Sequence, residues 1–159
     1  MRPQSLFPLF APITGLKGVG ARFAPLLEHV AGPRVRDVLF LSPQSVVRRR
    51  PAKVAELVEG EVQTLIVTIE SHQKPARPNL PWKILAADDT GFITLAFFKG
   101  HGPHLERQNP KGAARVVSGK VERDRYAMVL QMAHPDYLLP VEMAAEVPKI
   151  EAIYPATAG

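Results

Sequence analysis

The sequence predicts a mainly β fold, a small five-stranded barrel preceded by an α-helical segment. From residue 61 onward, short apolar segments alternate with polar ones, which is typical of strands. Residues 82–99 contain two apolar segments joined by Asp-Asp-Thr-Gly, the pattern of a β-hairpin. The chain also has 16 prolines, roughly twice the usual share of about 5%, and they favour many short elements over long helices.

Composition limits the classes of protein to consider. The chain has 159 residues, of which 46% are hydrophobic, enough to bury a core. It has no cysteine, which excludes a disulfide framework and thiolate metal sites. No apolar run approaches the roughly 20 residues of a membrane span, and no signal-peptide pattern opens the chain, so we expect a cytoplasmic protein. The net charge of +5 is compatible with nucleic-acid binding.

Residues 1–58 are predicted to form the helical segment. Short helices are expected at residues 5–10, 21–30 and 35–41. The apolar residues expected to face inward are Leu16, Val19, Phe23, Leu26 or Leu27, Val35, Val38, Leu39 and Leu41. The triplet Arg48–Arg50 then forms a basic link, either a solvated loop or a source of phosphate contacts.

A turn at residues 16–20, Leu-Lys-Gly-Val-Gly, has the form of a helix-hairpin-helix turn. Its glycines would let the backbone approach a phosphate, which amides at the next helix's N-terminus could hold. The candidate phosphate-binding residues are Lys17, Gly18, Gly20 and Arg22. The alternative is a tight turn between two packed helices with no ligand.

Five strands and one short helix are predicted in residues 59–140. The strands are expected at residues 62–70, at the two halves of the hairpin, and at 114–122 and 126–132, with a helix near 104–108. The side chains expected to face the core are Leu65, Val67, Ile69, Ile93, Leu95, Phe97, Val117, Val121, Met128, Leu130 and Met132. Phe98 then points outward, where it either stacks on a base or packs under a loop.

Three strands, a short helix and two strands is the order of an OB-fold, a five-stranded Greek-key barrel. Such barrels bind oligonucleotides across their second and third strands and the loops beside them, by base stacking on aromatic rings and by cations along the backbone. The candidate DNA-binding residues at these places are Phe98, Lys99, Lys74, Arg77, Arg123 and Arg125.

No pattern in the chain indicates catalysis or a metal site. His101 and His104 are three residues apart but lack a cysteine or an acidic cluster beside them. The adjacent Asp88 and Asp89 are better suited to forming a turn than to acid–base chemistry, and no phosphate-binding loop or nucleophile elbow is present. We therefore predict no catalytic residue and no cofactor in this chain.

Several motifs resemble, in order and spacing, the N-terminal region of the RecG family of bacterial ATP-dependent DNA helicases. The similarity covers about residue 13 to the end. The motifs are Leu16–Gly20, Asp37-Val-Leu-Phe40, Asp89-Thr-Gly91, Phe97-Phe98, Val117-Ser-Gly-Lys-Val121, Gln131-Met-Ala-His-Pro135 with Tyr137, and Ile153-Tyr-Pro-Ala-Thr157-Ala-Gly159.

This resemblance implies a wedge domain at residues 59–140 that contacts and splits branched DNA, such as replication forks and Holliday junctions, in repair and recombination. Residues 141–159 would lead to motor domains that use ATP and Mg²⁺. The family's stacking Phe matches Phe98, whereas a Tyr found four residues later in some members falls on Gly102, and His101 or His104 could take its place. The resemblance also implies a bacterial, nucleoid-associated protein.

Two other functions fit the same barrel. One is a freestanding protein that binds single-stranded DNA or RNA, and the other is a protein-interaction module whose groove holds a peptide. A preference for forked DNA over a single strand distinguishes the wedge from the first, and negligible nucleic-acid affinity would indicate the second.

Overall fold

The chain forms two compact units in the computed structural model, which describes residues 3–98, 102–124 and 127–156. The first, the helical unit, consists of Met1–Val47 and Glu151–Gly159. The second, the barrel unit, consists of Arg48–Ile150. The division at residues 58 and 140 suggested by the sequence stays a prediction. No helix in the described part of the chain has both the length and the apolar character needed to cross a membrane.

The helical unit contains short elements only. They are the 3₁₀ helices η1 (Gln4–Phe10) and η2 (Ile13–Gly15), the α-helices α1 (Ala24–Val30) and α2 (Val35–Leu39), and most of a two-stranded sheet of β1 (Ser45–Arg48) and β9 (Ile150–Ile153). Helix α1 begins at Ala24, later than the predicted residue 21, with Pro25 in its first turn. Proline lacks an amide hydrogen and is best tolerated in the first turn of an α-helix, which favours a start close to Pro25.

The inward-facing residues predicted for the helical unit are partly wrong. Phe23, Leu26 and Leu39 are exposed, whereas Ile13 and Ala24 are buried. Helices of one or two turns present too few residues to one side to bury a continuous apolar stripe. The helical unit therefore keeps large apolar side chains on its surface.

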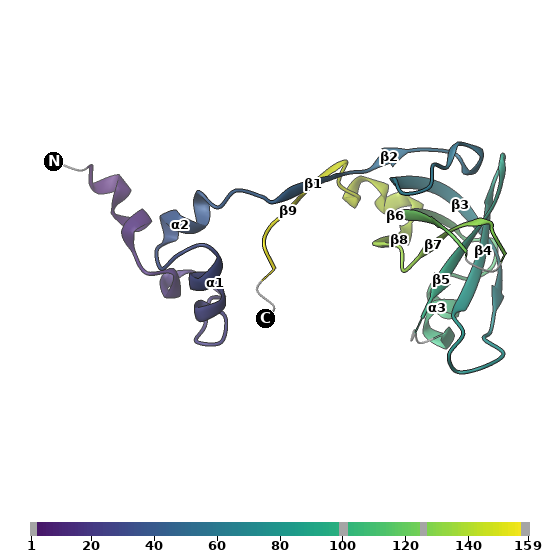
Figure 1. Cartoon of the computed structure of the whole chain (residues 1–159), viewed down its shortest axis with the longest axis horizontal. Helices are drawn as coiled ribbons and strands as arrows, with labels where there is room; N and C mark the ends of the chain where they lie inside the picture. The colour runs from purple at the N-terminus through teal and green to yellow at the C-terminus, as the bar shows by residue number, and fades with distance from the viewer. Residues whose placement is uncertain (1–2, 99–101, 125–126, 157–159) are drawn as a thin grey trace. The chain divides into compact units, whose positions relative to one another are not determined.

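The barrel unit contains most of the strands (Figure 1). Its strands are β2 (Arg50–Pro51), β3 (Val62–Gln73), β4 (Trp82–Asp88), β5 (Gly91–Phe97), β6 (Ala114–Arg123), β7 (Leu130–Ala133) and β8 (Tyr137–Pro140). Its helices are η3 (Val54–Glu56), α3 (Gly102–Gln108) and η4 (Val141–Glu146). Helix α3 lies between β5 and β6 in the chain, as the predicted order requires.

Five of these strands close into a barrel. Strand β3 pairs with both β4 and β6, and the ring is completed by the pairs β4–β5, β5–β7 and β7–β6. A register shift between Ile69 and Ser71 bends β3, so that its first half pairs with β6 and its second half with β4. The predicted mainly β fold with a five-stranded barrel is confirmed.

The barrel interior is filled by alternate residues of each strand, as the period of two predicts. The fully buried side chains include Leu65, Ile69, Ile84, Ile93, Leu95, Val117, Val121 and Met132. Phe97 is partly buried against this core, and the next residue, Phe98, is exposed, so the face assignment of the hairpin is confirmed.

The predicted start of the last barrel strand is wrong. Strand β7 begins at Leu130, and Met128, expected to face the core, is 61% exposed with a φ of 56°. The Asp124 carboxylate accepts a hydrogen bond from the Ala127 amide, and the Asp124 amide donates to the Val129 carbonyl. These bonds hold residues 127–129 in a loop, which the apolar composition of the segment does not reveal.

Candidate nucleic-acid interface

A hollow of about 670 Å³ lies on the barrel unit, between the β3–β4 loop, the β6–β7 loop and the end of β5. These are the loops and strands that OB-folds use to bind oligonucleotides. The residues that line it are Gln73, Lys74, Pro75, Ala76, Asn79, Leu80, Pro81, Lys83, Phe98, Glu122, Arg123, Asp124 and Gln131. The structure thus brings together three of the predicted DNA-binding residues, Lys74, Phe98 and Arg123.

Phe98 supplies the aromatic surface of the hollow. It follows the last residue of β5, and its side chain is 45% exposed. The Phe98 amide donates a hydrogen bond to Nε2 of His134 at 2.9 Å, and the two rings lie 5.9 Å apart at an angle of 32°. A ring held in this way and half open to solvent can accept a base on its free surface.

The cations of the hollow differ in how they are bound. Arg123 pairs with Glu59 at 3.1 Å and donates to the Met128 carbonyl. Lys74 lies with its Nζ 5.9 Å from the centroid of the Trp82 ring. Neither Lys74 nor Arg77 forms an ion pair within the described residues, so both charges are available for phosphates.

The remaining predicted residues lie elsewhere. Arg77 is exposed on the same β3–β4 loop but does not line the hollow. Lys99 and Arg125 lie outside the described residues, as does His101. His104 is exposed on α3.

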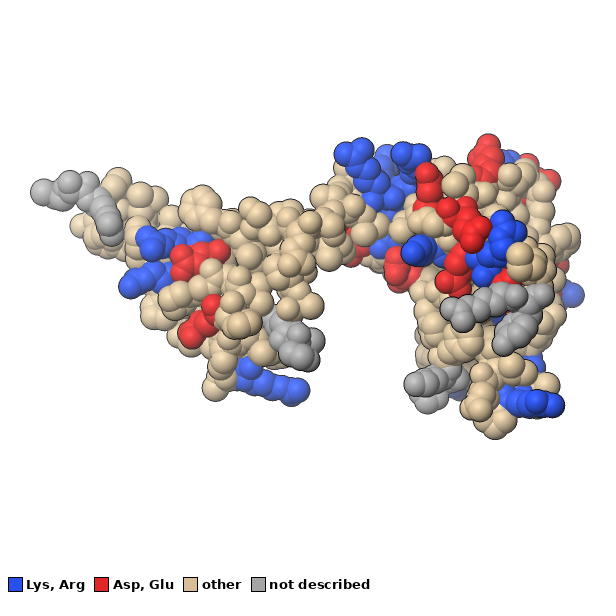
Figure 2. Space-filling view, viewed as in Figure 1, with Lys and Arg blue, Asp and Glu red and all other residues tan. Residues whose placement is uncertain are grey.

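Sequence reasoning missed Lys83 and Gln131 as residues of the hollow. Lys83 pairs with Asp124 at 3.1 Å, and Gln131 donates to the Glu122 carboxylate at 3.2 Å. Their position follows from the alternation of strands, because their neighbours Trp82 and Met132 face the core. Figure 2 shows acidic and basic side chains mixed on the visible face of the barrel unit, so charge of a single sign does not cover the face in this view.

The absence of a side chain at position 102 is explained by a contact with Trp82. A Cβ atom on Gly102 would overlap Cε3 and Cζ3 of the Trp82 ring. That ring is fixed in turn, because its Nε1 donates to Nδ1 of His72 at 3.0 Å and Nε2 of His72 bonds to the Asn109 carbonyl at 2.7 Å. Trp82 therefore occupies the space that a side chain at position 102 would need.

The turn at residues 16–20 has the open backbone expected for a phosphate site. Gly18 has a φ of +90°, and added Cβ atoms on Gly18 and Gly20 would meet nothing within 4 Å. Lys17 and Arg22 are exposed and make no ion pair with any described residue. The preceding element is a three-residue 3₁₀ helix, η2, and the amide-bearing start of α1 lies four residues after Gly20. Phosphate binding at this turn stays a prediction.

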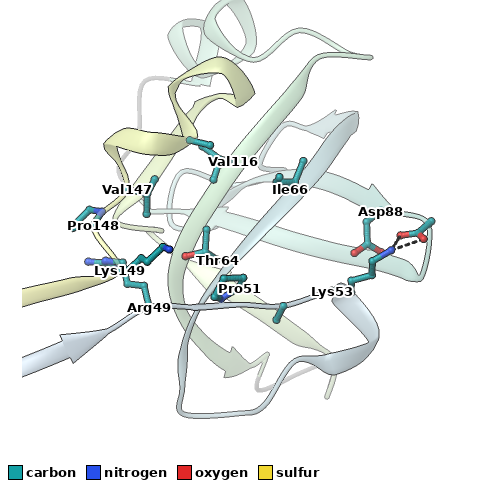
Figure 3. Close-up of a pocket in the computed structure, with 13 residues that line it drawn as sticks. Arg49, Pro51, Lys53, Thr64, Ile66, Asp88, Val116, Val147, Pro148 and Lys149 are labelled. Carbon is teal, nitrogen blue, oxygen red and sulfur yellow. Dashed lines mark hydrogen bonds and ion pairs between the residues drawn. The ribbon is translucent and has the colours of Figure 1, made fainter.

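A second hollow, of about 490 Å³, contains none of the predicted DNA-binding residues (Figure 3). Thr64, Ile66 and Val116 line it from β3 and β6, together with Arg49 and Lys149. Its charged residues are largely engaged within the protein. Lys53 pairs with Asp89 at 2.6 Å, a hydrogen bond that raises the pKa of Lys53, and Arg49 pairs with Asp136 at 2.7 Å.

No group of three or more His, Asp or Glu side chains among the described residues is arranged to hold a metal ion. The first hollow offers the aromatic ring of Phe98, hydrogen-bonding side chains such as Asn79 and Gln131, and charged side chains of both signs.

Comparison with known proteins found one relative in sequence and several solved structures with a similar fold. No model of a protein family matches the chain. The ATP-dependent DNA helicase RecG of Acidithiobacillus ferridurans is 27% identical over 160 residues, which cover 95% of this chain and 22% of the relative. The chain thus spans about a fifth of the length of that curated relative.

Among solved structures, RecG bound to a three-way DNA junction aligns with 92% of this chain and 20% of its own, with a TM-score of 0.74 and 23% identity. The second OB-fold domain of replication protein A from Methanococcus maripaludis aligns with 58% of this chain and 96% of its own, with a TM-score of 0.45 and 21% identity. In sequence and in fold, this chain resembles the N-terminal, OB-fold-containing region of the ATP-dependent DNA helicase RecG.

Proposed function

We propose that this chain binds branched DNA and acts as the DNA-splitting wedge of a RecG-like helicase in repair and recombination. The observation that carries the proposal is the hollow that joins Phe98, Lys74 and Arg123 on the oligonucleotide-binding side of the barrel. The fold is shared with a RecG that was solved on a three-way DNA junction, which supports a branched substrate.

In this proposal, Phe98 stacks on a base at the branch point, and Lys74, Arg77, Lys99, Arg123 and Arg125 contact the phosphates beside it. The turn at residues 16–20 supplies a further phosphate contact through Lys17, Gly18, Gly20 and Arg22. Base stacking contributes about 1–3 kcal/mol for each base, and each neutralised phosphate adds to the salt dependence.

Hydrolysis of ATP belongs, in the same proposal, to motor domains of a longer parent protein that bind ATP and Mg²⁺. The exposed aromatic residues of the helical unit, Phe7, Phe23 and Phe40, would suit contact with a protein partner such as those domains, because binding would remove their apolar surface from water. The protein would act in the cytoplasm, on the nucleoid.

The experiment that tests the proposed function compares forked DNA with a single strand of equal length at two salt concentrations. We expect tighter binding to the fork at both, with an affinity that falls as salt rises. Equal affinity for the two DNAs would favour a general single-strand binder. Negligible binding at physiological salt would favour a protein-interaction module, and either result would overturn the wedge.

A further inference from the structure

We propose that His134 is a positioning residue that holds Phe98 in its DNA-binding orientation. The expected effect on DNA affinity rests on the proposed function. The contact between His134 and Phe98 rests on the geometry around His134 alone. His134 is not among the residues that line the hollow, but its ring lies 5.9 Å from the ring of Phe98.

His134 is tied to the end of β5 by two hydrogen bonds. Its amide donates to the Ala96 carbonyl at 2.8 Å, and its Nε2 accepts from the Phe98 amide at 2.9 Å. Strands β5 and β7 pair in parallel as far as Ala96 and Ala133. The imidazole thus continues the pairing beyond the last strand residues, with a side-chain nitrogen in place of a backbone carbonyl.

The ring of His134 also packs against both adjacent phenylalanines. It meets Phe97 edge-on, at 6.0 Å and 77°, and Phe98 at 5.9 Å and 32°. Phe97 is partly buried against the core, so His134 joins a partly buried ring to an exposed one. This arrangement supports Phe98 from one side and leaves its other side for a base.

The backbone conformation of His134 favours this contact. Its φ is 47°, in the left-handed region, which directs the side chain of the first residue after β7 toward the end of β5. This orientation places Nε2 where it can accept the Phe98 amide hydrogen. A side chain preset in this way reduces the ordering that DNA binding would otherwise require of Phe98.

The test is a double-mutant cycle on the full chain, read by forked-DNA affinity. We expect His134→Ala to weaken binding by about 2- to 10-fold, the cost of ordering one side chain. In the Phe98→Ala background the same change should alter affinity by less than about twofold, because His134 acts through Phe98. An unchanged affinity for His134→Ala, or an equal loss in both backgrounds, would overturn the proposal.

Two further variants separate positioning from general stability. Gln can place an acceptor near the position of Nε2, so His134→Gln should restore affinity to within about twofold of the starting chain. Asn tolerates the left-handed backbone but is too short to reach the Phe98 amide, so His134→Asn should behave as His134→Ala does and provides the test if the alanine variant does not fold. Failure of rescue by Gln would count against positioning.

A measurement without DNA distinguishes failure of this inference from failure of the proposed function. Hydrogen exchange of the Phe98 amide, followed by NMR, should be faster in His134→Ala and His134→Asn than in His134→Gln and the starting chain. Unchanged exchange would overturn the positioning role even if the chain binds forks. Faster exchange in a chain that binds no DNA would support the role of His134 and reject the wedge.

Discussion

Phe98 is the residue on which the proposed interface depends most. Phe98→Ala should weaken fork binding by about 1–3 kcal/mol, the value of one stacked base. The melting temperature should change little, because Phe98 is 45% exposed and lies outside the core. Fluorescence anisotropy with forked DNA and thermal unfolding measure the two quantities.

A matched control for this change is Phe92→Ala. Phe92 is on β5, the strand that Phe98 follows, is 68% exposed and does not line the hollow. Its removal should leave fork affinity unchanged. Equal losses of affinity for both variants, or a large fall in melting temperature for Phe98→Ala, would contradict the role given to Phe98.

At Gly102, a single added methyl group has a predictable cost. Gly102→Ala should lower the free energy of unfolding by about 1–3 kcal/mol, since the new Cβ would overlap the buried Trp82 ring. Urea unfolding measures the change. The cost should shrink when Trp82→Leu is made in the same chain, and an undiminished cost there would show that the strain has another source.

The β4–β5 hairpin shows how an element depends on one carboxylate. Asp88 accepts hydrogen bonds from the Thr90 hydroxyl and from the amides of Val54, Thr90 and Gly91. Desolvation works to raise the pKa of Asp88, but these hydrogen bonds together outweigh it and lower that pKa below its usual value. The charged form therefore stabilises the turn.

The lowered pKa of Asp88 makes this stability depend on pH. Because the folded pKa is depressed, the contribution is present at neutral pH and is lost as pH falls below the ordinary pKa of an aspartate and through the lower folded one. Asp88→Asn should cost about 1 kcal/mol of unfolding free energy at pH 7, and the difference from the starting chain should narrow toward pH 3. Asp89→Asn is the control, since the interaction of Asp89 with the described residues is an exposed pair with Lys53. A difference that does not vary with pH would contradict the assignment.

At the scale of the whole molecule, the two units differ in how much they bury. The barrel unit encloses a continuous apolar core, whereas the buried hydrophobic residues described in the helical unit are Ile13 and Ala24. In hydrogen exchange followed by mass spectrometry, the amides of β3 and β6 should exchange slowest and those of α1 and α2 much faster. Equal protection of both units would mean that the helical unit is stabilised by packing that its exposed residues do not indicate.

The sequence by itself determined the barrel. Alternation of apolar residues is a local property, so the inward faces around Leu65, Ile93 and Val117 could be predicted from spacing alone. The order of the strands and the outward turn of Phe98 followed from the same pattern. The resemblance to RecG is also carried by the residues themselves.

Only the tertiary structure decided which residues share a site. Lys74, Phe98 and Arg123 come from three separate segments, and their meeting at one hollow depends on how the barrel closes. The tertiary structure also explains three other features. Trp82 excludes a side chain at Gly102, the chain forms a loop at Met128, and His134 supports Phe98. Local periodicity holds no information on such contacts, because they join residues whose separation in the chain is unrelated to their separation in space.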